Sequence, residues 1–511
     1  MKRALAWLLC AALLLSGCTA PGEDMPEDGQ GESEPAQIAN AEFGVGYVSE
    51  ARMDPLATTN KENLELAGLV YEGLFELDET LAVQPVLCDS FEMSGNTYRF
   101  RIKSGVKFSD GSALTAGDVV YSLRRALREG SYYAARLSNI SGVRAEGGDV
   151  LVTLHRANAN LPRLLDIPIV KEASGDAQIT LGTGPYCIVY SAENKEYSLA
   201  KNVHWRGDAP PFQTIQMIQT GGVDQLIWGF ESMSIDLVTL DPTGPNPLQF
   251  RGEYESHEVA TSVLVYLGFN LRTRAFQNET VRRAVACAID RKSAVEQDYA
   301  LMGHAALLPV HPLCAAYDET AAGALAYSME QAMELMKQAG YRDQDGDGRL
   351  DSGGSRSFTI LVNNENKSRV ALAQRIVQSL GDLGLNVSLR EEKWEDYQKA
   401  LAAGDFDLYL AEVNLRGDFN LDALLRSGGS ANYGGYSSGE TDAQLDAYHG
   451  RELVHSAENT AFYQHFAKTA PIIPILFKKH TAVTHRDFFS ALTPTQRNPY
   501  YHFSSWKVVE R

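Results

Sequence analysis

One serine of the sequence lies in a pattern that serine hydrolases use. Residues 435–439 fit G-x-S-x-G, with Ser437 as the nucleophile. That chemistry requires a buried strand before the serine and a sharp turn at it, but residues 427–434 are rich in glycine and serine, which is typical of a loop. Two other interpretations are a loop that precedes a helix, or a wall of a ligand cleft to which Tyr433 and Tyr436 contribute amphipathic surface.

An acidic turn offers oxygen ligands in the order of a calcium loop. Asp343, Asp345 and Asp347 occupy its first, third and fifth positions, and Asp351 the ninth. The twelfth position holds Gly354 where a bidentate glutamate belongs, and no second helix follows. We therefore expect a solvated turn that binds calcium weakly or not at all, and we expect no other cofactor.

The histidines and cysteines suggest no metal site. The 11 histidines are scattered, and the sequence has no HExxH, no Walker loop and no GxGxxG that opens a helix. Of the six cysteines, Cys10 and Cys18 lie near the N-terminus, and the other four form no CxxC pair: Cys88, Cys187, Cys287 and Cys314. Cys287 lies within an apolar helical pattern and is expected to be a buried thiol.

Composition and charge limit the possible partners. The chain has 511 residues, more than one hydrophobic core usually serves, so we expect two or more domains. Its 44% hydrophobic and 22% charged residues are typical of a globular protein. A net charge of −19 disfavours binding to phosphate and therefore argues against nucleic acid as a partner.

The first residues form a targeting segment. Lys2 and Arg3 precede an apolar run at 4–15, and residues 15–18 read Leu-Ser-Gly-Cys, which resembles the lipobox of bacterial lipoproteins. The resemblance implies cleavage after residue 17 and lipidation of Cys18; an ordinary secretory signal with an unrelated cysteine is the alternative. Residues 18–40 are rich in proline, glycine and acids and are expected to be a disordered tether. We expect a protein held by lipid on the outer face of the cell membrane.

Periodicity predicts alternating helices and strands. Helices are expected at 61–75, from Thr115 to 127, from Asn278 to 289, and from Ser328 to Gly340, each with a capping residue or an apolar face. Strands are expected at 97–102, 150–154, 186–190 and 262–269. Residues 358–413 then alternate strand, helix, strand, helix and strand, which predicts a parallel sheet.

Three sequence blocks resemble the extracellular solute-binding proteins of family 5, the peptide, dipeptide and nickel type. The first comprises residues 69–74 and 98–120, which include Gly-Val-Lys-Phe-Ser-Asp-Gly at 105–111. The second is Gly-Thr-Gly-Pro-Tyr at 182–186. The third comprises residues 269–270, 281–284 and 288–291. Their order and spacing together carry the resemblance.

The resemblance implies an α/β, bilobal, class II periplasmic-binding-protein-like fold. A discontinuous lobe I would comprise residues 41–270 and 475–511, and an inserted lobe II residues 271–474. Hinge rotation would close the lobes on a ligand that touches both. It also implies a monomeric substrate-binding component of an ABC importer that takes a small ligand, most simply an oligopeptide, to its permease. A lipoprotein that senses another solute, and a serine hydrolase, are the alternatives.

The ligand anchor is expected where the strand at 406–413 ends, because ligands of parallel sheets bind beyond the carboxyl ends of the strands. Peptide binders of the family commonly carry a tryptophan and an aspartate there, and the aspartate pairs with the peptide amine. This sequence has no tryptophan at that place. Glu412 or Asp418 could hold the amine and Arg416 a carboxylate. The remaining candidate ligand residues are Asn414, Tyr433, Tyr436, Thr58 and Asn60.

Overall fold

The computed structural model describes residues 42–49, 52–174, 179–350 and 357–508. The targeting segment, the tether and Cys18 lie outside these ranges, as does Asp351. No helix in the described ranges has the length and apolarity that crossing a bilayer requires. Buried apolar residues form two large clusters, one for each lobe, and a small third cluster around helix α3 (Val223–Glu231) and strand β11 (Leu237–Leu240). The described chain is therefore bilobal, as expected.

Lobe I contains two four-stranded sheets, ordered β1-β10-β9-β8 and β4-β5-β7-β6, and the β2–β3 hairpin. The C-terminal residues return to its core through Phe489, Tyr500, Phe503 and Trp506. Its elements are β1 (Gly44–Tyr47), α1 (Lys61–Val70), β2 (Phe75–Leu77), β3 (Val83–Pro85), β4 (Cys88–Ser94), β5 (Thr97–Ile102), α2 (Ala116–Ala126), β6 (Ile140–Glu146), β7 (Asp149–Leu154), β8 (Tyr186–Ser191), β9 (Glu196–Lys201), β10 (Thr214–Gln219), α3 (Val223–Glu231), β11 (Leu237–Leu240), β18 (Phe489–Ser490) and β19 (Lys507–Val508).

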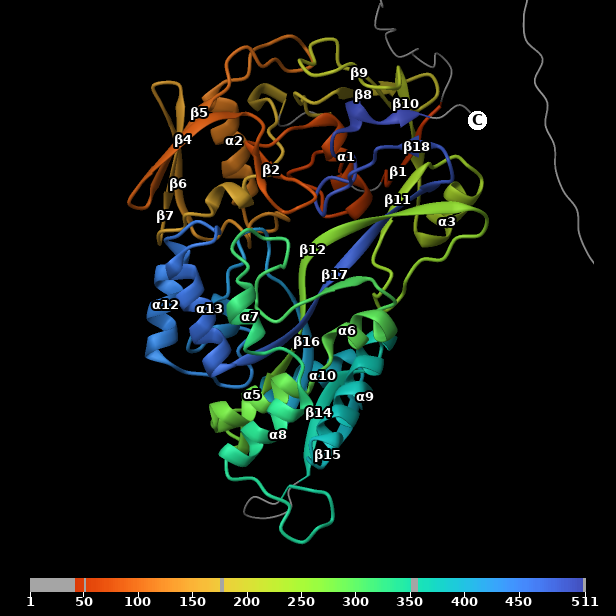
Figure 1. Ribbon diagram of the computed structural model, residues 1–511. Coiled ribbons are helices and arrows are strands. Elements are labelled where there is room, and N and C mark those ends of the chain that lie inside the picture. The colour runs from red at the N-terminus through yellow and green to blue at the C-terminus, as the bar shows by residue number, and fades with distance from the viewer. Residues whose placement is uncertain (1–41, 50–51, 175–178, 351–356, 509–511) are drawn as a thin grey trace, which may run out of the picture. The chain divides into compact units, whose positions relative to one another are not determined.

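Lobe II is built on a mixed sheet with helices around it (Figure 1). Strands β14, β15 and β16 pair in parallel, in the order β15-β14-β16, so the βαβαβ prediction is confirmed. Its elements are α4 (Arg274–Gln277), α5 (Glu279–Ala288), α6 (Arg291–Ser293), β13 (Gly303–Ala305), α7 (Glu319–Gly323), α8 (Met329–Gln338), β14 (Phe358–Asn363), α9 (Lys367–Asp382), β15 (Val387–Glu392), α10 (Trp394–Ala403), β16 (Leu408–Asn414), α11 (Asp422–Leu425), α12 (Gly439–His449) and α13 (Ala457–Thr469).

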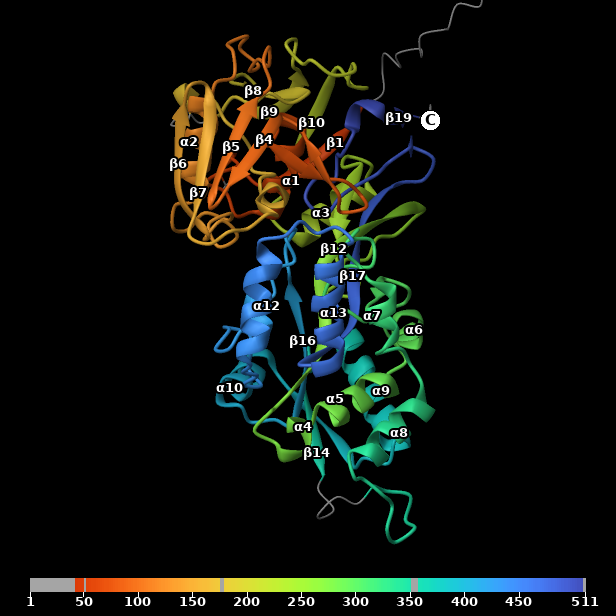
Figure 2. The same ribbon diagram turned by 60° about the vertical axis from the view of Figure 1, so that its left-hand side comes forward.

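Two long antiparallel strands, β12 (Tyr254–Phe269) and β17 (Ile472–His485), join the lobes and lie side by side in both ribbon views (Figures 1 and 2). Their register shifts between Ala260 and Leu264 and again between Val265 and Tyr266. Residues 264–269 and 472–477 contribute to the core of lobe II, so the first irregularity lies where the chain leaves that core. A β-bulge bends a strand locally, which makes this place suitable for a hinge. The boundaries after residues 270 and 474 stay a prediction.

Capping explains where several helices begin. Thr115 and Asp118 form the expected capping box of α2, and the Ser328 side chain accepts a hydrogen bond from Gln331 N at the start of α8. Helix α1 ends five residues before the predicted end. The Gly-rich turn at 182–185 contacts its last residue, and Gly184 N donates to Val70 O at 2.9 Å. A tertiary contact thus decides this boundary.

The four cysteines of the described chain are free thiols, and Cys287 is buried as expected. Burial raises the pKa of Cys287 and, to about 11, that of Cys88. Both groups are therefore protonated and unreactive at neutral pH.

Candidate ligand-binding site

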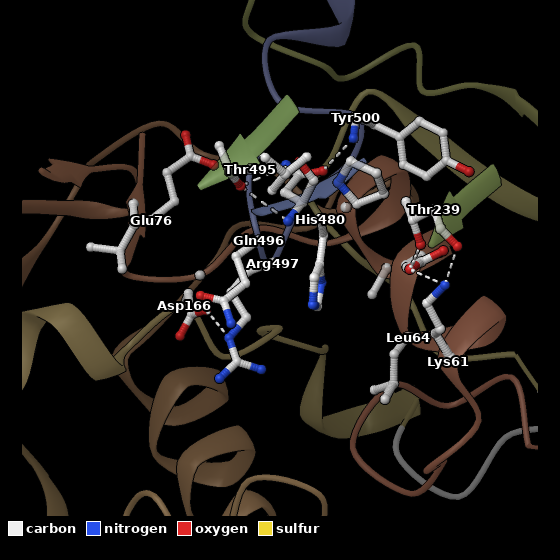
Figure 3. A pocket seen from close by; sticks show the side chains of 18 of the residues that line it. Lys61, Leu64, Glu76, Asp166, Thr239, His480, Thr495, Gln496, Arg497 and Tyr500 are labelled. Carbon is white, nitrogen blue, oxygen red and sulfur yellow. Dashed lines mark hydrogen bonds and ion pairs between the residues drawn. The ribbon is translucent and has the colours of Figure 1, made fainter. Parts of the chain in front are cut away.

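A cavity of about 1050 Å³ lies at the strands that join the lobes. Its volume is at the upper end of the range for sites that enclose small ligands. Lobe I supplies most of the wall, through residues within 59–77, 239–248 and 495–505. Strands β12 and β17 contribute Val259, Val263, His480 and Thr481, and Asn414 lines it from the end of β16. Figure 3 shows part of this wall.

Helix α1 forms one side of the cavity. The Asn60 side chain caps it by accepting a hydrogen bond from Asn63 N at 3.0 Å. Lys61 and Glu65, one turn apart, are paired at 3.4 Å. Glu65 also accepts a hydrogen bond from the Thr239 hydroxyl, which ties α1 to β11. Burial raises the pKa of Glu65, although Lys61 opposes the shift.

A turn of the C-terminal segment forms another side. Thr495 N donates to Asn498 O at 3.0 Å, and Asn498 N donates to the Thr495 hydroxyl at 3.1 Å. The side-chain oxygen of Gln496 accepts from Ser262 N at 3.0 Å. The turn is thus fixed on itself and bonded to the hinge strand β12, so its polar side chains are pre-organised around the cavity.

Four charged groups form a row that ends at the cavity wall, where Asp241 lines the cavity. Arg369 is 2.7 Å from the Glu412 carboxylate, and Lys478 Nζ is 3.6 Å from the same oxygen. Lys478 also donates to Asp241 at 2.5 Å. Burial alone would raise the pKa of Asp241, but Lys478 holds it below its usual value. Signs alternate along this row, so each carboxylate is neutralised.

The end of β16 opens at the cavity, since Asn414 lines it. The Asn414 side chain accepts hydrogen bonds from the Ser262 hydroxyl and from Arg416 N, both at 2.9 Å. Glu412, two residues earlier in the strand, does not line the cavity and pairs with Arg369 and Lys478 instead of Arg416.

Arg416 and Asp418 lie away from the cavity, at a second contact between the lobes. The Arg416 guanidinium donates to Ala135 O at 2.9 Å. The Asp418 carboxylate accepts from the Asn158 side chain at 3.1 Å. Burial raises the pKa of Asp418. These two residues therefore bond lobe II to lobe I, and their role toward a ligand stays a prediction.

The other candidates from the sequence have contacts within the fold and do not line the cavity. The Tyr433 ring lies edge-on to Tyr409 at 5.8 Å, and the Tyr436 hydroxyl bonds to that of Thr441 at 2.8 Å. The Thr58 hydroxyl accepts from Asn60 N at 3.2 Å, while the residue between them, Thr59, does line the cavity.

Ser437 is placed just before α12. Its hydroxyl donates to the Ser427 hydroxyl at 3.2 Å, and Ser438 caps the helix. The nearest strand before it, β16, ends at Asn414, so the serine does not follow a strand directly. This geometry differs from the strand–turn–helix that a G-x-S-x-G nucleophile needs.

The three aspartates of the acidic turn gather their oxygens within 4.8 Å of one another, an arrangement able to hold a cation. They are exposed and already accept backbone N–H groups of the same turn: Asp343 from Gly346 and Gly348, Asp345 from Asp347, and Asp347 from Arg349. A cation would have to compete with these bonds.

Sequence reasoning missed most of the wall. Glu76, Asp166, Thr239, His480 and Arg497 line the cavity from elements far apart in the chain. They follow no common motif, and their grouping depends on β17 and the C-terminal turn returning to lobe I. The available signal was the assignment of residues 475–511 to lobe I, which did not by itself indicate that this segment lines the cavity.

Comparison with known proteins identifies the family. The model of the bacterial extracellular solute-binding proteins, family 5, matches residues 82–434. The chain belongs to this family. It is similar to the oligopeptide-binding protein AppA of Bacillus subtilis, with 26% identity over 417 residues and coverage of 76% of both chains. It is also similar to the oligopeptide-binding protein OppA of the same organism, with 22% identity over 556 residues and coverage of 98% of both.

Solved structures show the same fold. The unliganded open form of the periplasmic murein tripeptide binding protein MppA matches with a TM-score of 0.74 and 19% identity, over 93% of this chain and 99% of that one. AppA of Bacillus subtilis in complex with a nonapeptide matches with a TM-score of 0.58 and 21% identity, over 92% and 99%. The expected bilobal binding-protein fold is thereby confirmed.

Proposed function

We propose that this protein captures a short peptide in the cavity between its lobes and delivers it to the permease of an ABC importer. The cavity carries this proposal, because its wall combines lobe I, both hinge strands and Asn414 of lobe II. A ligand that touches both lobes stabilises the state in which both sets of contacts are made. The naming of similar proteins as oligopeptide-binding supports a peptide as the ligand.

The composition of the wall suits a peptide. Carboxylates, amides and hydroxyls alternate with the aromatic side chains of Tyr132, Trp205 and Tyr500. Polar groups can bond to a peptide backbone, and aromatic faces accept varied side chains at little entropic cost. Such a wall holds backbones firmly and reads side chains loosely.

We further propose that the protein is a monomer held on the outer face of the cell membrane by lipid on Cys18. The lipobox-like residues 15–18 and the acidic, proline-containing segment after them support this anchor. The proposal assigns no enzymatic activity, because the serine of the hydrolase alternative, Ser437, lies in a loop where its hydroxyl bonds to that of Ser427.

Calorimetry on the soluble protein tests the proposal. A pool of tri- to hexapeptides is titrated into the wild type, and the peptides are analysed by mass spectrometry after overnight incubation. We expect saturable binding of one peptide per chain and full recovery of intact peptides. Cleavage that disappears in Ser437→Ala would favour the hydrolase instead, and the absence of any saturable binding would contradict a peptide ligand.

A further inference from the structure

We propose that Glu76 receives a positively charged group of the ligand, an amine or guanidinium, and so selects cationic ligands. This inference rests on the proposed function, because it places the ligand in the same cavity. Glu76 lies on β2 of lobe I and lines the cavity wall. In Figure 3 it is on the side of Asp166 and Arg497, across from Lys61 and Thr239.

Most carboxylates of the wall have a cation of their own within the protein. Glu65 pairs with Lys61 at 3.4 Å and Asp241 with Lys478 at 2.5 Å. The remaining pairs are Glu72 with Arg206 at 2.6 Å, and Asp166 with Arg136 at 2.7 Å and Arg497 at 3.8 Å. These four carboxylates are neutralised before any ligand arrives.

Glu76 differs from them. Within the part of the chain that the structure describes, its carboxylate forms no ion pair; its side chain is hydrogen-bonded to Asn498. The charged groups with the largest effects on its pKa are Glu72, Asp166 and Asp78, all of them acidic. Burial, followed by Glu72, raises the pKa of Glu76 to about 7. The cavity wall therefore contains a carboxyl group without a cationic partner among the described residues.

A ligand cation would satisfy this group. A partly buried carboxylate without a partner is costly, and a charge-assisted bond to an ammonium or guanidinium removes that cost. Asn498 lowers the pKa of this carboxyl group, and its own side chain packs against Gly68 so closely that a β-carbon there would lie 2.2 Å from Asn498 Oδ1.

The carboxylates of lobe II are less suited to this role. Glu412 lies between Arg369 and Lys478, and Asp418 is bonded to Asn158 outside the cavity. Glu76 also lies next to the lobe contact: its hairpin turn places Leu81 in the core cluster of lobe II. A charged ligand at Glu76 is therefore held where the lobes meet.

The test uses a peptide pool in matched forms. Each tri- to hexapeptide sequence is present with a free or acetylated amino terminus, and with lysine or norleucine at one position. The protein is incubated with the pool and separated by size exclusion, and retained peptides are counted by mass spectrometry. We expect wild type to retain cationic forms at least tenfold over uncharged ones. Glu76→Gln should lose this preference.

Glu79→Gln is the matched control, because Glu79 is an exposed carboxylate on the same hairpin and does not line the cavity. It should keep the wild-type preference. Glu76→Asp keeps the carboxylate but shortens the side chain by one methylene, so it should show an intermediate preference for cationic peptides. This variant replaces Glu76→Gln in the test if Glu76→Gln fails to fold. Wild type without a preference for cationic forms, or Glu76→Gln with an unchanged tenfold preference, would overturn the inference.

A second experiment distinguishes failure of the proposed peptide ligand from failure of the proposed role of Glu76. If wild type retains no peptide of any form, the same proteins are melted with agmatine, putrescine and 1,4-butanediol. A rise in melting temperature with either amine, absent with butanediol and absent in Glu76→Gln, would support Glu76 as a cation site for a different ligand. No such rise would overturn it.

Discussion

Replacing Glu76 by glutamine should stabilise the empty protein, and the gain should grow with pH. The pKa of Glu76 is raised from 4.5 to about 7 by burial and by Glu72, so the fold favours the protonated carboxyl. The linked stabilisation is complete below pH of about 4.5 and is lost as pH rises through about 7. Glutamine is neutral at every pH and resembles the protonated form. The wild type should therefore lose stability relative to Glu76→Gln as the pH rises.

The magnitude follows from the two pKa values. With 4.5 in the unfolded chain and about 7 in the folded one, the cost of ionising Glu76 is on the order of 1 kcal/mol at pH 5 and on the order of 3 kcal/mol at pH 8. The stability difference between the two proteins should thus change by roughly 2 kcal/mol over this range. For a chain of this size, that corresponds to about 2–3 °C in melting temperature.

Differential scanning calorimetry at pH 5, 6, 7 and 8 measures this difference without ligand. Glu79→Gln should follow the wild type at every pH, because Glu79 is exposed. A Glu76→Gln melting temperature that runs parallel to that of wild type between pH 5 and 8 would refute the reasoning. A Glu76→Gln protein that is less stable than wild type at pH 8 would also refute it, because the carboxylate would then stabilise the empty protein.

Three other changes test separate parts of the structure. Lys478→Met should lower the free energy of unfolding by on the order of 2 kcal/mol in urea titrations, because Asp241 and Glu412 lose the cation that they share. The loss is limited because each carboxylate is about one-third exposed to solvent. An unchanged unfolding midpoint would show that this pairing contributes nothing to stability. Cys18→Ser should move the protein from the membrane fraction to the medium, and full retention on immunoblots would indicate another anchor. Millimolar calcium should raise the melting temperature of the wild type by less than about 1 °C and leave that of Asp345→Ala unchanged; a large rise that is lost in the variant would establish a calcium site.

Local patterns were sufficient for much of the fold. Periodicity and capping located α2, α8 and the β14–β16 unit, because side chains within a few residues decide these elements. Strand β12 was predicted only from residue 262, although it begins at Tyr254. Its first half reads Tyr-Glu-Ser-His-Glu-Val-Ala-Thr, which lacks a regular apolar alternation, and pairing with β17 more than 200 residues away makes it a strand.

The candidate site was harder to predict for the same reason. Asn414, at the end of β16, lines the cavity, and the order of strands in a parallel unit indicates where such carboxyl ends lie. The sequence does not indicate which carboxylate lacks a cationic partner in the fold. Glu412 and Glu76 are both acids near strand ends, and only the fold shows that Arg369 and Lys478 neutralise the first.

The most direct test of the central claim is calorimetric titration of the peptide pool into a protein whose cavity is filled. Leu64 lines the cavity on α1, so Leu64→Trp adds bulk inside it, whereas Met333→Trp adds the same group at an exposed position of α8. We expect Met333→Trp to bind peptide like wild type and Leu64→Trp to lose at least tenfold in affinity while it keeps its melting temperature. Equal peptide binding by both variants would contradict a ligand site in this cavity.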